Sequence, residues 1–110
     1  MKSTLELIDL VEKSVSENEM TLILGGDHSI GLGSIAGHCK AFPNSIVVWV
    51  DAHTDMNTPE SSASKNTHGM PVAFALRETS KLIPQTRGFE KIKPVCVRVY
   101  KIYSCLPLFD

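Results

Sequence analysis

Cysteine is scarce in this sequence of 110 residues, and its placement excludes two kinds of site. The three cysteines, Cys39, Cys96 and Cys105, are odd in number and show no CxxC spacing. We therefore expect neither a disulfide framework nor a structural zinc site, and the pattern fits a reducing compartment.

The sequence also lacks an excess of charge and a long apolar run. Lys and Arg number 11 against 12 Asp and Glu, so a nucleic-acid or anionic-membrane partner is not expected. The longest apolar run, residues 46–50, is far shorter than the roughly 18 residues that indicate a transmembrane helix. Lys2, Glu6 and Asp9 interrupt the first residues, which excludes the apolar core of a signal peptide. We expect a soluble, intracellular protein with a small-molecule partner.

The apolar pattern predicts one α/β domain. A hydrophobic content of 43% is enough for a globular core, and helical spacing predicts a helix over about residues 4–17. Short apolar runs at residues 20–24 and 46–50 predict buried parallel strands, with a helix over residues 29–40 between them. This βαβ unit implies a parallel sheet with a right-handed crossover. The remaining predicted elements are a polar loop over residues 57–68, a helix over residues 71–82 and a strand over residues 95–100.

Polar clusters follow both predicted strands. His28 comes after the first strand, and Asp51, His53 and Asp55 come after the second, where ligand sites of open α/β sheets lie. A fully extended chain would separate Asp51 and Asp55 by about 13 Å, at about 3.3 Å per residue, so the chain must bend near Ala52. Two imidazoles with two carboxylates suit Mn, Zn or Fe(II). The sequence therefore predicts a metal site.

Three motifs, in their order and spacing, resemble the arginases of the ureohydrolase family. They are GGDHS at residues 25–29, DAHTD at residues 51–55 and NTHGMPV at residues 66–72. The resemblance covers roughly residues 5–82. Agmatinase-like members share the first two motifs, but residues 55–59 and 68–72 match the arginase subgroup better. Arginase is the preferred interpretation, and an agmatinase-like ureohydrolase is an alternative.

The resemblance implies a binuclear manganese site. His28, Asp51 and Asp55 would serve one ion, while Asp51 and His53 would serve the other, with Asp51 as the bridge. Two ions sharing a water lower its pKa, and the resulting hydroxide would attack the guanidinium carbon of L-arginine. The products would be L-ornithine and urea.

The resemblance also implies roles for the loop that follows. His68 resembles the proton-shuttling histidine of the family, and an imidazole suits that role because its unperturbed pKa is about 6.5. Asn57, Ser64 and Asn66 correspond to loop residues that bind the α-carboxylate of the substrate, although a merely polar loop would have the same composition. Lys65 replaces the small residue that is common at its position.

Part of the family pattern is missing from the sequence. A later Asp-x-Asp motif and a later acidic substrate contact have no counterpart, so we expect the second manganese ion to bind weakly. We therefore predict a partial arginase/deacetylase-like three-layer fold in a truncated chain, with a partial catalytic domain over residues 1–94 and a divergent tail over residues 95–110. The alternative is a catalytically inactive relative that binds metal weakly or associates with full-length subunits, since the family is trimeric. The expected compartment is the cytoplasm, with the mitochondrion as the alternative.

Overall fold

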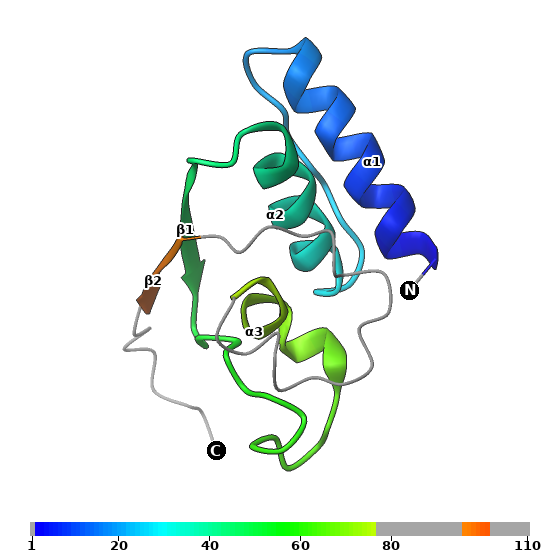
Figure 1. Ribbon diagram of the computed structural model, residues 1–110. Coiled ribbons are helices and arrows are strands. Elements are labelled where there is room, and N and C mark those ends of the chain that lie inside the picture. Colours follow the sequence, from blue (N-terminus) through cyan, green and yellow to red (C-terminus); the bar gives the residue numbers. More distant parts are fainter. Residues whose placement is uncertain (1, 77–95, 102–110) are drawn as a thin grey trace.

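The computed structural model describes residues 2–76 and 96–101. Of the predictions, the helices over residues 4–17 and 29–40 and the strands over residues 46–50 and 95–100 are confirmed. No helix among these described residues is long and apolar enough to cross a membrane. The elements, traced in Figure 1, are α1 (Lys2–Glu17), α2 (Ile30–Ala41), β1 (Ile46–Asp51), the 3-10 helix η1 (Thr67–Gly69), α3 (Pro71–Ala75) and β2 (Cys96–Lys101).

Helix α2 lies between α1 and β1, and it packs on both (Figure 1). Toward α1, it presents two glycines, Gly33 and Gly37, against Leu7, Ile8 and Val11. A Cβ on Gly37 would lie 2.6 Å from the backbone oxygen of Ile8, so only glycine allows this approach. Both glycines therefore allow α2 to pack closely on helix α1.

The other face of α2 builds the core against β1 and α3. Leu32, Ile35 and Cys39 are buried there with Ala75 of α3. Burial raises the pKa of the Cys39 thiol, as expected for a small apolar core residue. From β1, Val47 and Trp49 pack on this cluster because alternate strand side chains share a face.

Strand β1 pairs in parallel with β2, from Ile46 opposite Cys96 to Asp51 opposite Lys101. The side chains of Ile46, Val48 and Val50 point away from the core and are 66%, 59% and 63% exposed. The outer face of β1 is therefore apolar and open.

The predicted strand over residues 20–24 is wrong. This segment is not part of a strand, and the one strand that pairs with β1 in the described part of the chain is β2. Met20, Leu22 and Leu24 are 85%, 79% and 86% exposed, whereas a buried parallel strand would cover them. High β-propensity is not sufficient, because a strand also needs a hydrogen-bonding neighbour. The predicted βαβ unit is thus not formed by these residues.

Helix α3 is shorter than the predicted helix over residues 71–82. Pro71 opens it at a position where proline is favoured, and it ends at Ala75. Leu76 has φ −82° and ψ 136°, which is extended backbone. Residues 77–82 lie outside the described residues.

Candidate metal centre

His28 is held by a turn that leads into α2. The backbone N–H of Ser29 donates to Asp27 Oδ1 (2.8 Å), and the N–H groups of Ile30 and Gly31 donate to the carbonyls of Asp27 and His28. Asp27 therefore orders the turn. The pKa of Asp27 lies below its ordinary value, chiefly because the Ser29 hydroxyl and N–H donate to its carboxylate.

The chain bends directly after β1, as the spacing of the carboxylates required. Bends at Ala52 and His53 follow Asp51, whose Oδ1 accepts the backbone N–H of His53 (2.9 Å). Asp55 has φ 51°, a left-handed conformation that turns the chain, and its carbonyl accepts the N–H of Ala73 in α3 (3.0 Å). These contacts return Asp55 to the end of β1.

Three of the four predicted metal ligands converge. His28 Nε2 lies 2.7 Å from Asp55 Oδ2 and 3.8 Å from Asp51 Oδ2. One ligand atom from each of the three residues lies within 4.8 Å of the other two. Two ligands of one ion are at most about 4.4 Å apart if each bond is about 2.2 Å long, as for carboxylate oxygens on zinc. A shift of a few tenths of an ångström would therefore close this group around a cation.

The burial of the three donors differs in a way that suits a site open on one side. The Asp55 side chain is 8% exposed, the Asp51 side chain 25% and the His28 side chain 38%. One nitrogen and two carboxylate oxygens suit borderline or hard divalent cations. The donor set thus fits the manganese that the resemblance implies.

His53 is outside this group. Its side chain is 83% exposed, and its Nδ1 lies 3.6 Å from Asp51 Oδ1, on the side of the carboxylate opposite to the oxygen nearest His28. Asp51 consequently lies between the two imidazoles, with one oxygen near each. In this arrangement Asp51 could bridge two metal sites. On the Oδ1 side of Asp51, His53 is the imidazole that lies near the carboxylate.

The other predicted site residues lie on the exposed loop that joins β1 to α3. His68 is exposed on η1, and its charge makes a small contribution to the lowered pKa of Asp27. Asn57 accepts a hydrogen bond from the Ser61 hydroxyl (3.4 Å), and Ser64 Oγ accepts the backbone N–H of Asn66 (3.4 Å).

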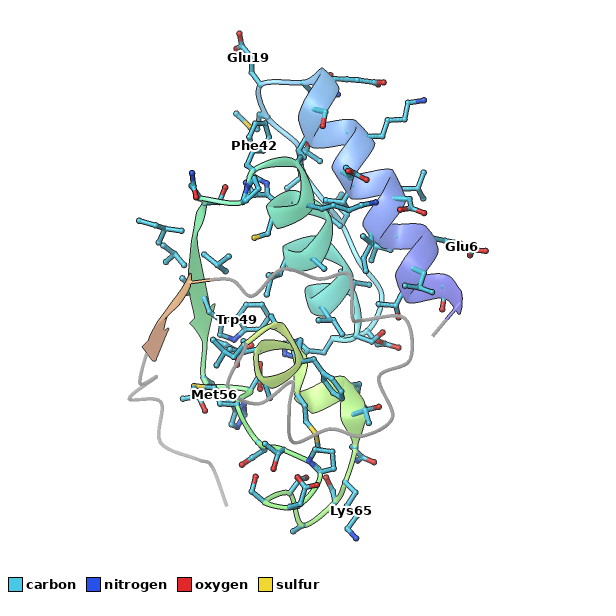
Figure 2. All side chains as sticks on the ribbon, viewed as in Figure 1. Glu6, Glu19, Phe42, Trp49, Met56 and Lys65 are labelled. Atoms are coloured by element: carbon cyan, nitrogen blue, oxygen red, sulfur yellow. The ribbon has the colours of Figure 1, made fainter. Side chains whose placement is uncertain are left out.

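Lys65 lies within the same loop and has φ 57°, which favours glycine over a long side chain. Figure 2 shows Lys65 at the far tip of the loop. Lys65, which replaces the small residue common at this position, therefore has a backbone conformation that favours a small residue.

Trp49 is a site residue that the sequence did not reveal. Its Nε1–H donates to Asp55 Oδ2 (3.2 Å), and its ring meets that of His28 edge to face, with centroids 5.6 Å apart. In the sequence Trp49 reads as one member of an apolar strand. The available signal was its position two residues before Asp51, which places both side chains on one face of β1.

The fold and the site define an α/β protein with a histidine and two aspartates arranged for a divalent cation. The sequence matches the model of the Arginase family over residues 2–92, and the chain belongs to that family. It is 49% identical to human "Arginase-2, mitochondrial" over 89 residues, which are 81% of this chain and 25% of the human protein. It is 43% identical to "Arginase-1" of Bos taurus over 93 residues, which are 84% of this chain and 29% of the bovine protein.

Solved structures agree with the family. A cold-adapted arginase from the psychrophilic yeast Glaciozyma antarctica superposes with a TM-score of 0.71 at 34% identity, over 91% of this chain and 38% of the yeast chain. The arginase of Bacillus caldovelox gives 0.67 at 38% identity, over 89% of this chain and 33% of that chain. The chain thus spans about a quarter of the length of the human relative.

Proposed function

We propose that this chain carries part of an arginase-type manganese centre and acts in the hydrolysis of L-arginine to L-ornithine and urea. The observation that supports this most directly is the convergence of His28, Asp51 and Asp55 within 4.8 Å in a member of the arginase family. Hydrolysis requires a water molecule activated beside the guanidinium carbon, and these three donors are of the kind that hold a divalent cation for that purpose.

His28, Asp51 and Asp55 are the proposed ligands of the first ion, and His53 is the proposed ligand of a second, weaker one. A bound manganese ion would act as a Lewis acid and lower the pKa of water. The second ion would have Asp51 and His53 as its protein ligands. Because the His53 side chain is exposed, the binding of the ion would have to fix the position of this imidazole. We therefore expect one ion at most at low micromolar manganese.

The loop between β1 and α3 is proposed to bind the substrate and move the proton. Asn57, Ser64 and Asn66 are exposed polar groups that could donate to or accept from the α-carboxylate and α-amine of L-arginine. His68 is proposed to carry the proton to the leaving amine, because an imidazole gains and loses a proton near neutral pH.

The test is urea release from L-arginine by the purified chain of 110 residues with added Mn²⁺. The proposal expects urea that disappears in His28→Ala and persists in His38→Ala. His38 is the matched control because it is an exposed histidine on α2, the helix that follows the His28 turn, and it bonds Ser45 instead of the carboxylates. Agmatine in place of arginine distinguishes the agmatinase-like alternative. Absence of urea, in an assay where a known arginase is active, would remove the proposed activity for this polypeptide.

A second proposed function is association with another arginase-type subunit, without catalysis by this chain. It is favoured by six large apolar side chains that are more than half exposed on two segments. Parallel sheets normally bury both faces, and apolar surface of this kind commonly marks an interaction site. The residues are Met20, Leu22, Leu24, Ile46, Val48 and Val50.

The remaining assignments stay proposals. Residues 1–94 would form a partial catalytic domain of the three-layer arginase/deacetylase-like fold, and residues 95–110 a divergent tail. Within that tail, strand β2 supplies a parallel neighbour for β1, which supports a structural contribution from Cys96–Lys101. The proposed compartment is the cytoplasm, with the mitochondrion as the alternative, and the proposed assembly is a homo-oligomer.

A further inference from the structure

Trp49 contacts two of the proposed metal ligands, although it cannot bind a metal itself. Its indole N–H bonds Asp55 Oδ2, and its ring lies against the His28 ring at an interplanar angle of 72°. Figure 2 shows Trp49 extending from β1 toward α2 and α3. The indole nitrogen carries a hydrogen and has no lone pair to offer, so it can act only as a donor.

The Asp55 carboxylate needs such a donor more than an exposed carboxylate would. At 8% exposure it has lost most of its hydration, and burying a charge is unfavourable unless hydrogen bonds compensate. His28 and Trp49 both point at Oδ2. A cation bound between His28 and Asp55 would displace the histidine contact, because the same Nε2 would then face the cation. The indole hydrogen bond is compatible with either state.

The position of the Trp49 ring is itself fixed from the opposite side. It packs on the core cluster of α2, and a Cβ on Gly31 would lie 2.9 Å from its Cη2 atom. The Asp55 backbone is fixed separately by the Ala73 N–H. A rigid donor and an anchored backbone together leave the carboxylate one preferred orientation, which directs it toward His28.

We propose that Trp49 is the positioning residue of the metal centre: its indole N–H orients Asp55 and its ring restrains His28, so that the donor set is assembled before a cation binds. This inference rests on the proposed metal-binding function. It goes beyond it by assigning a role to a residue that neither binds the cation nor contacts the substrate. Hydrogen-bonding partners of ligands typically change metal affinity about 10- to 100-fold.

The first experiment compares the affinity of the full chain for Mn²⁺ in the wild type and in Trp49→Phe, by calorimetry. Phenylalanine keeps an aromatic ring in the core and removes the N–H. We expect the dissociation constant to rise about 10-fold or more. Phe42→Leu is the control, because Phe42 is a half-exposed aromatic that packs on His38, outside the site. Equal Mn²⁺ affinity of the wild type and Trp49→Phe would overturn the inference.

The second experiment reads the indole directly and needs no metal. Trp49 is the single tryptophan, so the chain has one indole ¹H–¹⁵N resonance. Asp55→Asn keeps the size of the acceptor but removes its charge, which weakens the bond and should move that resonance upfield. The exposed Glu60, changed to Gln, is the control and should leave it in place. An unmoved resonance in Asp55→Asn overturns the inference even if Trp49→Phe fails to fold.

The two failures are distinguishable. A wild-type chain that binds no Mn²⁺ contradicts the proposed function. A Trp49→Phe variant that binds Mn²⁺ as tightly as the wild type contradicts only the role of Trp49.

Discussion

Gly37→Ala should destabilise the chain, because it forces α1 away from α2. The new Cβ would lie 2.6 Å from the Ile8 backbone oxygen and 2.7 Å from Val11 Cβ. A backbone carbonyl cannot rotate away, so relief requires a shift of the helix itself. Overpacking of this kind costs about 1–3 kcal/mol, and alanine recovers about 1 kcal/mol through its higher helix propensity. Because the clash involves the backbone, we place the overpacking cost near the upper end of that range, so the net loss in the free energy of unfolding is about 1–2 kcal/mol.

The assay is urea unfolding of the purified full chain, followed by circular dichroism. With a slope of about 1–3 kcal/mol per molar urea, the midpoint should fall by roughly 1 M. Alanine variants of two other glycines serve as controls. For Gly33→Ala the nearest atoms belong to the Leu7 side chain, which can move, so this variant should lose less stability than Gly37→Ala. Gly26→Ala has no atom within 4 Å of the new Cβ and should be unchanged or slightly more stable. Gly37→Ala with wild-type stability would refute the close helix contact.

Three further predictions concern the ion pair, the loop and the histidines. The Glu12 carboxylate raises the pKa of Lys40, so this pair stabilises the fold below the unfolded lysine pKa of about 10.4 and ceases to do so as the pH rises through the higher folded value. The melting temperature of Lys40→Met should therefore be lower than that of the wild type at pH 8, and the difference should vanish at strongly alkaline pH. Lys65→Gly removes a left-handed penalty of about 1–2 kcal/mol against a glycine entropy cost of about 0.5–1 kcal/mol, so chemical unfolding should show a gain of up to about 1 kcal/mol. In calorimetry, His53→Ala should weaken Mn²⁺ binding more than His68→Ala, and equal effects would contradict the assigned roles.

The sequence predicted the local features of the site well, because they follow from residue spacing. The strand was predicted from the apolar run over residues 46–50, and the bend near Ala52 from the distance that an extended chain would place between Asp51 and Asp55. The convergence of His28 on Asp55 was also predicted, but through pairing of neighbouring strands. The structure achieves it through the turn before α2 and the Ala73 contact.

The features that were not predicted depend on partners distant in sequence. The run over residues 20–24 has strand composition, but composition does not specify a neighbour, and Leu22 is exposed in the structure. Gly33 and Gly37 pack against α1, and a glycine in a sequence does not identify the element that packs on it. The contact of Trp49 with Asp55 depends on the position that the bend after β1 gives to the Asp55 carboxylate, and no local sequence pattern specifies that position.

The central claim is that His28, Asp51 and Asp55 hold one divalent cation. Pulsed electron paramagnetic resonance of the full chain with one equivalent of Mn²⁺ tests it directly, since a coordinated imidazole imposes ¹⁴N modulation on the manganese signal. We predict modulation in the wild type and in His38→Ala, and its loss in His28→Ala. Modulation that survives in His28→Ala, or a wild-type signal with no nitrogen coupling, would contradict the claim.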